Sequence, residues 1–151
     1  MSFQEKNFTA SLITFTLILG YYLIRLFQII QGGNFNSTSV VRLWGFVIAF
    51  GIVGTILVTI FTHILSAITQ AIKTGGEDPK IEDIQDERDQ LIDLRGTKVT
   101  YIVSSVGVFL SMLTFAFGQP PLVMFCLLIF FAFFAQIVGD ISRLILYRRG
   151  F

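Results

Sequence analysis

Four long apolar segments constrain this sequence more than any other feature. They cover about residues 9–30, 42–70, 98–117 and 122–146, and few charged residues interrupt them. A hydrocarbon core about 30 Å thick needs roughly 20 apolar residues of helix to cross it. Only 14% of the 151 residues are charged, against about 25% in an ordinary soluble domain. The sequence therefore predicts an all-α, polytopic membrane protein, a four-helix bundle that forms one domain over residues 1–151.

The distribution of lysine and arginine predicts which side of the membrane each end faces. Four spans place both termini and the connector at 73–97 on one side. That side carries most of the basic residues, namely Lys6, Lys73, Lys80, Arg88, Arg95, Lys98, Arg148 and Arg149. The other side has Arg42, and also Arg25 if its side chain reaches the headgroups. Because cytoplasmic ends of spans are rich in Lys and Arg, we expect a bacterial inner-membrane protein with cytoplasmic N- and C-termini.

The connector at 73–97 is the most strongly charged part of the chain, and we expect it to form an amphipathic helix. On a helix its acids share one face, at spacings of four, three and four: Glu82, Asp86, Asp89 and Asp93. A second face combines apolar and basic side chains: Ile84, Arg88, Leu91 and Arg95. Neither face is satisfied within its own helix.

Three interpretations of the connector stay open. The helix can lie at the headgroup layer with its arginines on lipid phosphates. It can dock against basic residues such as Arg148 and Arg149, in the same chain, in another copy or in a protein partner. The acidic face can hold a divalent cation, although no loop wraps around it as in a dedicated site.

Small and hydroxyl side chains form a seam along each of two spans. In the second span they are Gly51, Thr55, Thr59, Thr62 and Ser66. In the third span they are Thr97, Thr100, Ser104, Gly107, Ser111 and Thr114. Such seams let membrane helices approach closely. We expect them to pack on each other or on a second copy, with a polar pathway between them as the alternative.

Ionisable residues inside a span are costly and are therefore candidates for function. Asp140 has Gln136 and Arg143 one turn away on the same helix face. His63 lies at a depth similar to that of Asp140. One interpretation is a local Asp140–Arg143 pair with His63 as a neutral packing residue. The other is a proton-responsive contact between His63 and Asp140, because histidine changes its charge near neutral pH.

Several functional classes find no support in the sequence. The chain has one His, one Cys and a net charge of +1. No metal-ligand spacing, phosphate-binding glycine loop or nucleophile elbow is present, so we expect no enzyme, no metal and no cofactor. Nucleic acid needs a basic face that this chain lacks.

The connector also carries a resemblance. The run Asp86-Glu87-Arg88-Asp89, followed by Ile92, Arg95 and Gly96 and then directly by a span, resembles an uncharacterised family of small four-helix bacterial inner-membrane proteins. The first six residues and the run from Tyr147 to Gly150 are similar too. Members of such families are often encoded beside small helix-turn-helix regulators, so the resemblance implies a sensory or accessory role. It implies no site residue.

These observations lead to two functional hypotheses. The first is a non-enzymatic membrane protein that acts as an interaction, accessory or sensory component and forms homo-oligomers through its seams. Its partners are the lipid bilayer, its own copies and a possible protein at the connector. The alternative is a small ion- or proton-conducting channel or transporter that uses His63, Asp140 and the seam of the third span.

Overall fold

The structure, a computed structural model, describes residues 3–74 and 87–149. Within these residues the chain forms four helices: α1 (Phe3–Gln31), α2 (Ser37–Thr74), α3 (Glu87–Ala116) and α4 (Pro121–Arg149). All four are long and apolar enough to cross a membrane. The prediction of an all-α chain with four helices of membrane-spanning length is therefore confirmed.

Glycine and asparagine end and start the helices at the two short turns. Gly33 and Gly118 adopt φ values of 67° and 81°, a region that glycine enters without a steric penalty. Gln119 N then donates to the Thr114 carbonyl at 3.1 Å, which closes the end of α3. Asn36 caps α2, since its Oδ1 accepts from Ser39 N at 2.9 Å.

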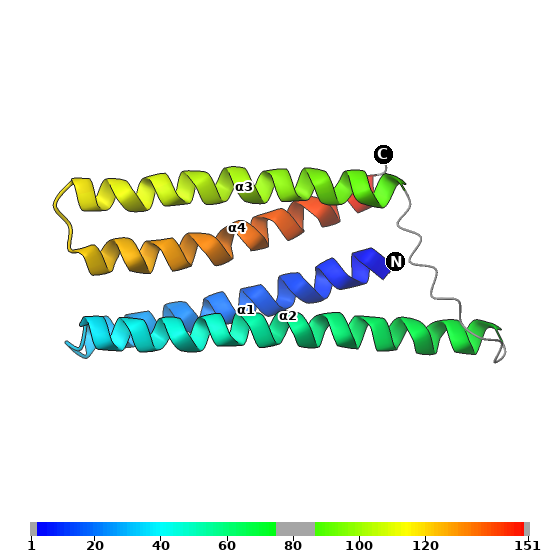
Figure 1. The fold of residues 1–151 in the computed structure, drawn as a ribbon, viewed down its shortest axis with the longest axis horizontal. Helices are drawn as coiled ribbons and strands as arrows, with labels where there is room; N and C mark the ends of the chain where they lie inside the picture. The colour runs from blue at the N-terminus through cyan, green and yellow to red at the C-terminus, as the bar shows by residue number, and fades with distance from the viewer. Residues whose placement is uncertain (1–2, 75–86, 150–151) are drawn as a thin grey trace.

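The helices are antiparallel and pack in the order α3–α4–α1–α2. α3 lies along α4, α4 lies along α1, and α1 lies along α2, whereas α2 meets α4 only lightly. Figure 1 shows both termini at the same end of the molecule. Among the described residues, α2 and α3 are thus the outer members of a row, and the predicted bundle is open rather than evenly closed.

The apolar core lies in the half of the molecule nearer the two turns. It is built from α1, α2 and α4 by six buried residues: Ile18, Tyr22, Leu43, Val47, Ile129 and Phe133. The Tyr22 hydroxyl donates to the Cys126 carbonyl at 2.8 Å and is satisfied within this core. In the half that holds the chain ends, the helices contact one another mainly through polar side chains.

The described part of the acidic segment, from Glu87 onward, belongs to α3 and is not a separate helix. α3 begins at Glu87 and continues without a break to Ala116, whereas a span starting near residue 98 was expected. Gly96 does not interrupt the helix, because it is buried under a side chain of α4. Glu82, Ile84 and Asp86 lie outside the described residues, as do the side chains of Thr62 and Ser66.

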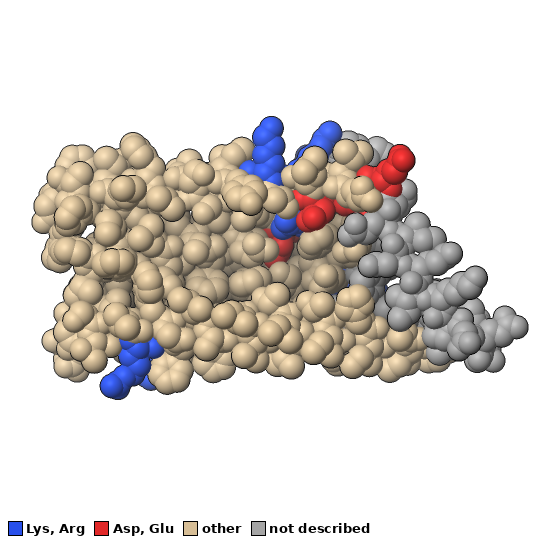
Figure 2. Space-filling model, viewed as in Figure 1, with Lys and Arg blue, Asp and Glu red and all other residues tan. Residues whose placement is uncertain are grey.

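Charged side chains form two separate groups on the surface shown in Figure 2. Figure 2 shows acidic and basic groups together over the first part of α3, and a separate basic group at the opposite end over α1 and α2. The surface between them carries exposed apolar side chains such as Leu17, Phe61 and Phe109. This distribution is typical of a protein whose middle contacts hydrocarbon.

Candidate functional site

An ion pair between Asp140 and Arg143 lies at the centre of the candidate site. The two residues are three positions apart on α4, and Arg143 Nη1 lies 2.9 Å from Asp140 Oδ1. Asp140 is 1% exposed and Arg143 is 7% exposed. Buried charges persist only when they are paired and hydrogen-bonded. The hydrogen bonds that neighbouring residues make to this pair therefore allow both charges to stay buried.

Arg143 connects α4 to α3. Its Nε donates to Asp93 Oδ1 at 2.9 Å, and its Nη2 donates to Thr97 Oγ1 at 2.8 Å. The guanidinium also lies over the ring of Phe8 on α1, 5.1 Å from the ring centroid. One side chain thus contacts two neighbouring helices with good geometry for each donor.

Two glycines create the space that Arg143 occupies. A Cβ atom at Gly96 would overlap the Arg143 side chain, with Nε only 2.7 Å away. On the facing helix, a Cβ atom at Gly139 would overlap the Thr100 hydroxyl. These contacts bring α3 and α4 close together, as small residues do between membrane helices.

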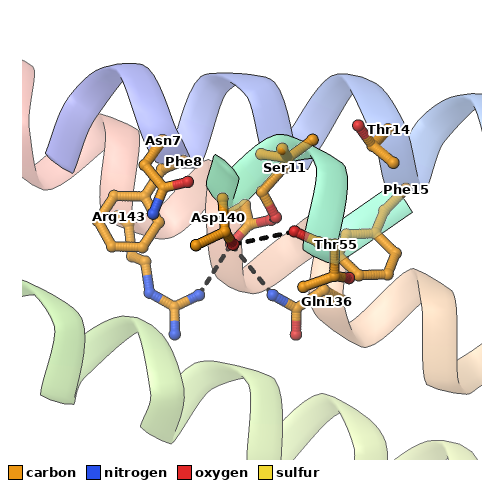
Figure 3. A pocket seen from close by; sticks show the side chains of 11 residues that line it. Asn7, Phe8, Ser11, Thr14, Phe15, Thr55, Gln136, Asp140 and Arg143 are labelled. Carbon is orange, nitrogen blue, oxygen red and sulfur yellow. Dashed lines mark hydrogen bonds and ion pairs between the residues drawn. The ribbon is translucent and has the colours of Figure 1, made fainter. Parts of the chain in front are cut away.

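Asp140 connects α4 to α1. Ser11 Oγ donates to Asp140 Oδ2 at 2.7 Å, and Gln136 Nε2 donates to Oδ1 at 3.2 Å. Figure 3 shows the Ser11, Gln136 and Arg143 side chains converging on this carboxylate from α1 and α4. Each carboxylate oxygen therefore has at least one donor, as a buried carboxylate requires.

Tyr147 extends the α3–α4 contact towards the chain end. Its hydroxyl donates to Asp89 Oδ1 at 2.7 Å, and Arg88 Nη2 donates to its carbonyl at 3.5 Å. The acidic face of α3 is therefore turned towards α4. Leu91 and Leu94 are 50% and 69% exposed on the opposite face.

A pocket of about 150 Å³ lies beside Asp140, between α1, α2 and α4 (Figure 3). Eight of the eleven residues that line it are polar: Asn7, Ser11, Thr14, Thr55, Thr59, Gln136, Asp140 and Arg143. The hydroxyls of Thr14, Thr55 and Thr59 each donate to the carbonyl four residues earlier. The pocket has room for several water molecules or a small polar group.

His63 is exposed on α2 and is not among the residues that line the pocket beside Asp140. α2 contributes Thr55, Val58 and Thr59 to this pocket. The contact between His63 and Asp140 stays a prediction. The arrangement observed is the other interpretation, the local pair of Asp140 with Arg143.

The described acids on the α3 face, Asp93 and Asp89, contact Arg143 and Tyr147 of α4. Positions 143 and 147 are one turn apart and share the face that meets α3, while Arg148 and Arg149 are exposed. Docking of the acidic face on Arg148 and Arg149 of another copy stays a prediction. Arg95 is exposed on the far side of α3.

Both seams of small residues contact other helices of the same chain. A Cβ atom at Gly51 would lie 3.5 Å from the ring of Phe133, and Thr55 and Thr59 line the pocket. On α3, Gly107 lies against Phe131, and a Cβ atom there would overlap it. The remaining seam residues of α3 are buried or half-buried: Thr100, Ser104, Ser111 and Thr114. Thr55 and Thr59 are nevertheless exposed, so packing of the seams on a second copy stays a prediction.

Four residues of the site were missed by sequence reasoning: Ser11, Phe8, Gly96 and Gly139. Ser11 was detectable in principle, because it is a hydroxyl near the N-terminal end of a mostly apolar helix. Gly139 directly precedes Asp140, and a small residue beside an intramembrane charge indicates a close helix. The contact of Phe8 with Arg143 could not be predicted, because the two residues lie on different helices and their spacing in the sequence carries no information about it.

No metal cluster is evident in the part of the chain that the structure describes, since no three His, Cys, Asp or Glu side chains gather there. No family model matches this chain, and neither a curated protein nor a solved structure matches it. The resemblance of the connector therefore stays a prediction.

Proposed function

We propose that this chain is a multi-pass protein of a bacterial inner membrane with both termini in the cytoplasm. Four antiparallel helices of membrane-spanning length support it. The basic residues of the sequence concentrate at the end that holds the termini, which is the cytoplasmic end by the rule for lysine and arginine. The acid-bearing start of α3 then faces the cytoplasm.

We further propose that the protein is a non-enzymatic interaction, accessory or sensory component that self-associates. The observation that carries this proposal is the outer stripe of α3, formed by Leu91, Leu94 and Arg95. Its two leucines are at least half exposed, while the acids behind it are held by α4. A helix fixed on one face and exposing leucine with arginine on the other presents a defined docking surface.

Cross-linking between copies tests this proposal. With Cys126→Ala as the background, we expect Leu94→Cys to give a disulfide-linked dimer when native membranes are oxidised, because two outer stripes face each other. Gln119→Cys, exposed at the turn between α3 and α4, is the matched control and is expected to stay monomeric on a gel. No dimer from Leu94→Cys, or an equal amount from both variants, would contradict self-association through the stripe.

The second candidate function is conduction of protons or small ions. One observation favours it: a polar pocket reaches a buried carboxylate between three membrane-length helices. The pocket is lined by α1, α2 and α4, so the seam of α3 and His63 do not form it. A pathway would therefore pass Ser11, Thr55 and Asp140.

Flux through proteoliposomes separates the two candidates. If the pocket conducts, purified protein should dissipate an imposed pH or ion gradient, and Asp140→Asn should lower the rate at least tenfold. His63→Ala is the matched control and should conduct as the unaltered protein does. Gradients that persist across several ions and pH values would exclude the second candidate and leave the first unaffected.

A further inference from the structure

A second groove lies at the opposite end of the molecule from Asp140. It has a volume of about 290 Å³ and lies between α1 and α2, beside the turn at Gly33. Two arginines from different helices, Arg25 and Arg42, line it together. Neither belongs to the candidate site described above.

The groove concentrates positive charge without a compensating acid. Both arginines are exposed. Arg25 Nη1 donates to Gln28 Oε1 at 3.1 Å, and its guanidinium lies 5.9 Å from the centroid of the Tyr21 ring. The Asp and Glu residues that the structure describes all lie in the half with the chain ends: Glu5, Glu87, Asp89, Asp93 and Asp140. Figure 2 shows this basic group isolated from the other charges.

The groove lies at the depth of lipid headgroups if the helices span a bilayer. α1 has 29 residues, about 43 Å at 1.5 Å per residue, which matches a bilayer of about 40–45 Å including its headgroups. Arg25 is six residues from the end of α1, and Arg42 is five residues into α2. Each is therefore roughly 8–9 Å from its helix end, and a long arginine side chain covers the remaining distance to the phosphates.

We propose that this groove binds one membrane phospholipid, with the lipid phosphate held between Arg25 and Arg42. Guanidinium groups bind phosphate oxygens through pairs of charge-assisted hydrogen bonds. The groove wall towards the hydrocarbon is partly apolar and exposed, through Tyr21 at 39% and Phe46 at 54%. A phosphate joined to an acyl chain would contact both the arginines and the apolar wall, whereas a free anion would contact only the arginines. This inference rests on the proposed membrane insertion.

Retention of phosphatidylglycerol by the full-length protein tests the proposal. Protein purified in detergent and supplied with this lipid is analysed by native mass spectrometry under increasing collisional activation. We expect one lipid to be retained, and Arg25→Gln/Arg42→Gln to weaken retention about tenfold for each arginine lost, since charge-assisted hydrogen bonds contribute at least that factor. Arg148→Gln/Arg149→Gln removes the same charge at the other end and should retain the lipid.

Two outcomes would overturn the proposal. Equal retention by the Arg25/Arg42 double variant and the unaltered protein would show that the groove does not hold the lipid. Displacement of the lipid by millimolar inorganic phosphate would assign the groove to a free anion. Resistance to alkaline extraction from membranes is measured in parallel. A protein that is extracted contradicts the proposed membrane insertion, whereas an inserted protein without arginine-dependent retention contradicts only the lipid site.

Discussion

Replacing Arg143 with alanine should lower the free energy of unfolding by about 3–5 kcal/mol, because it leaves the buried Asp140 carboxylate without its cation. The same change removes the donors to Asp93 and Thr97 and separates α3 from α4. Thermal unfolding of the purified protein in detergent, followed by circular dichroism, measures the loss.

Two variants sharpen this measurement. Arg148→Ala removes an exposed arginine of the same helix, and a surface substitution of this kind should change stability by less than about 0.5 kcal/mol. Asp140→Leu/Arg143→Met removes both charges and should be less damaging than Arg143→Ala alone, since no unpaired charge stays buried. If Arg143→Ala is as stable as Arg148→Ala, the ion pair does not hold the helices together.

Replacing Gly107 with leucine should destabilise the α3–α4 hairpin by about 3 kcal/mol, at the upper end of the usual range for overpacking. A Cβ atom at this position would overlap Cβ and Cγ of Phe131. The Phe131 Cβ is fixed by the backbone and cannot rotate away, so the two helices must separate. The loss is measured as the decrease in unfolding temperature relative to the unaltered chain.

Gly20→Leu on α1 is the control for this change. No atom lies within 4 Å of a Cβ at Gly20, and leucine favours a helix over glycine by up to about 1 kcal/mol. We therefore expect an unfolding temperature equal to or above that of the unaltered protein. A similar decrease for both glycine variants would show that the substitution acts through helix propensity or lipid contact and not through Phe131.

Length and hydropathy were enough to predict the helices, since each apolar segment forms one helix of the structure. They did not predict where α3 starts. Gly96 looked like a helix end, but its missing side chain is filled by Arg143, so the helix continues through it to Glu87. Local rules interpret a glycine by its effect on the backbone and contain no information about a side chain from another helix.

The site was predicted in part for a related reason. Depth along each span identified Asp140 and His63 as residues at one level, and helical spacing added Gln136 and Arg143. Which residues of other helices meet Asp140 depends on the order in which the helices pack and on their rotation, and neither follows from depth. Because α1 lies against α4, Asp140 accepts a hydrogen bond from Ser11, a residue that depth alone did not single out.

The Ser11–Asp140 hydrogen bond has a consequence for how the protein assembles. It joins positions 129 residues apart, whereas α1–α2 and α3–α4 are each closed by a short turn and need only local contacts. Short loops close at a smaller entropic cost than long ones, so the two hairpins can form independently before they associate. The buried carboxylate then gains its α1 donor only when the first and last helices meet. Before the two hairpins associate, the Asp140 carboxylate lacks its Ser11 donor. A chain whose hairpins have formed but have not associated therefore exposes this carboxylate.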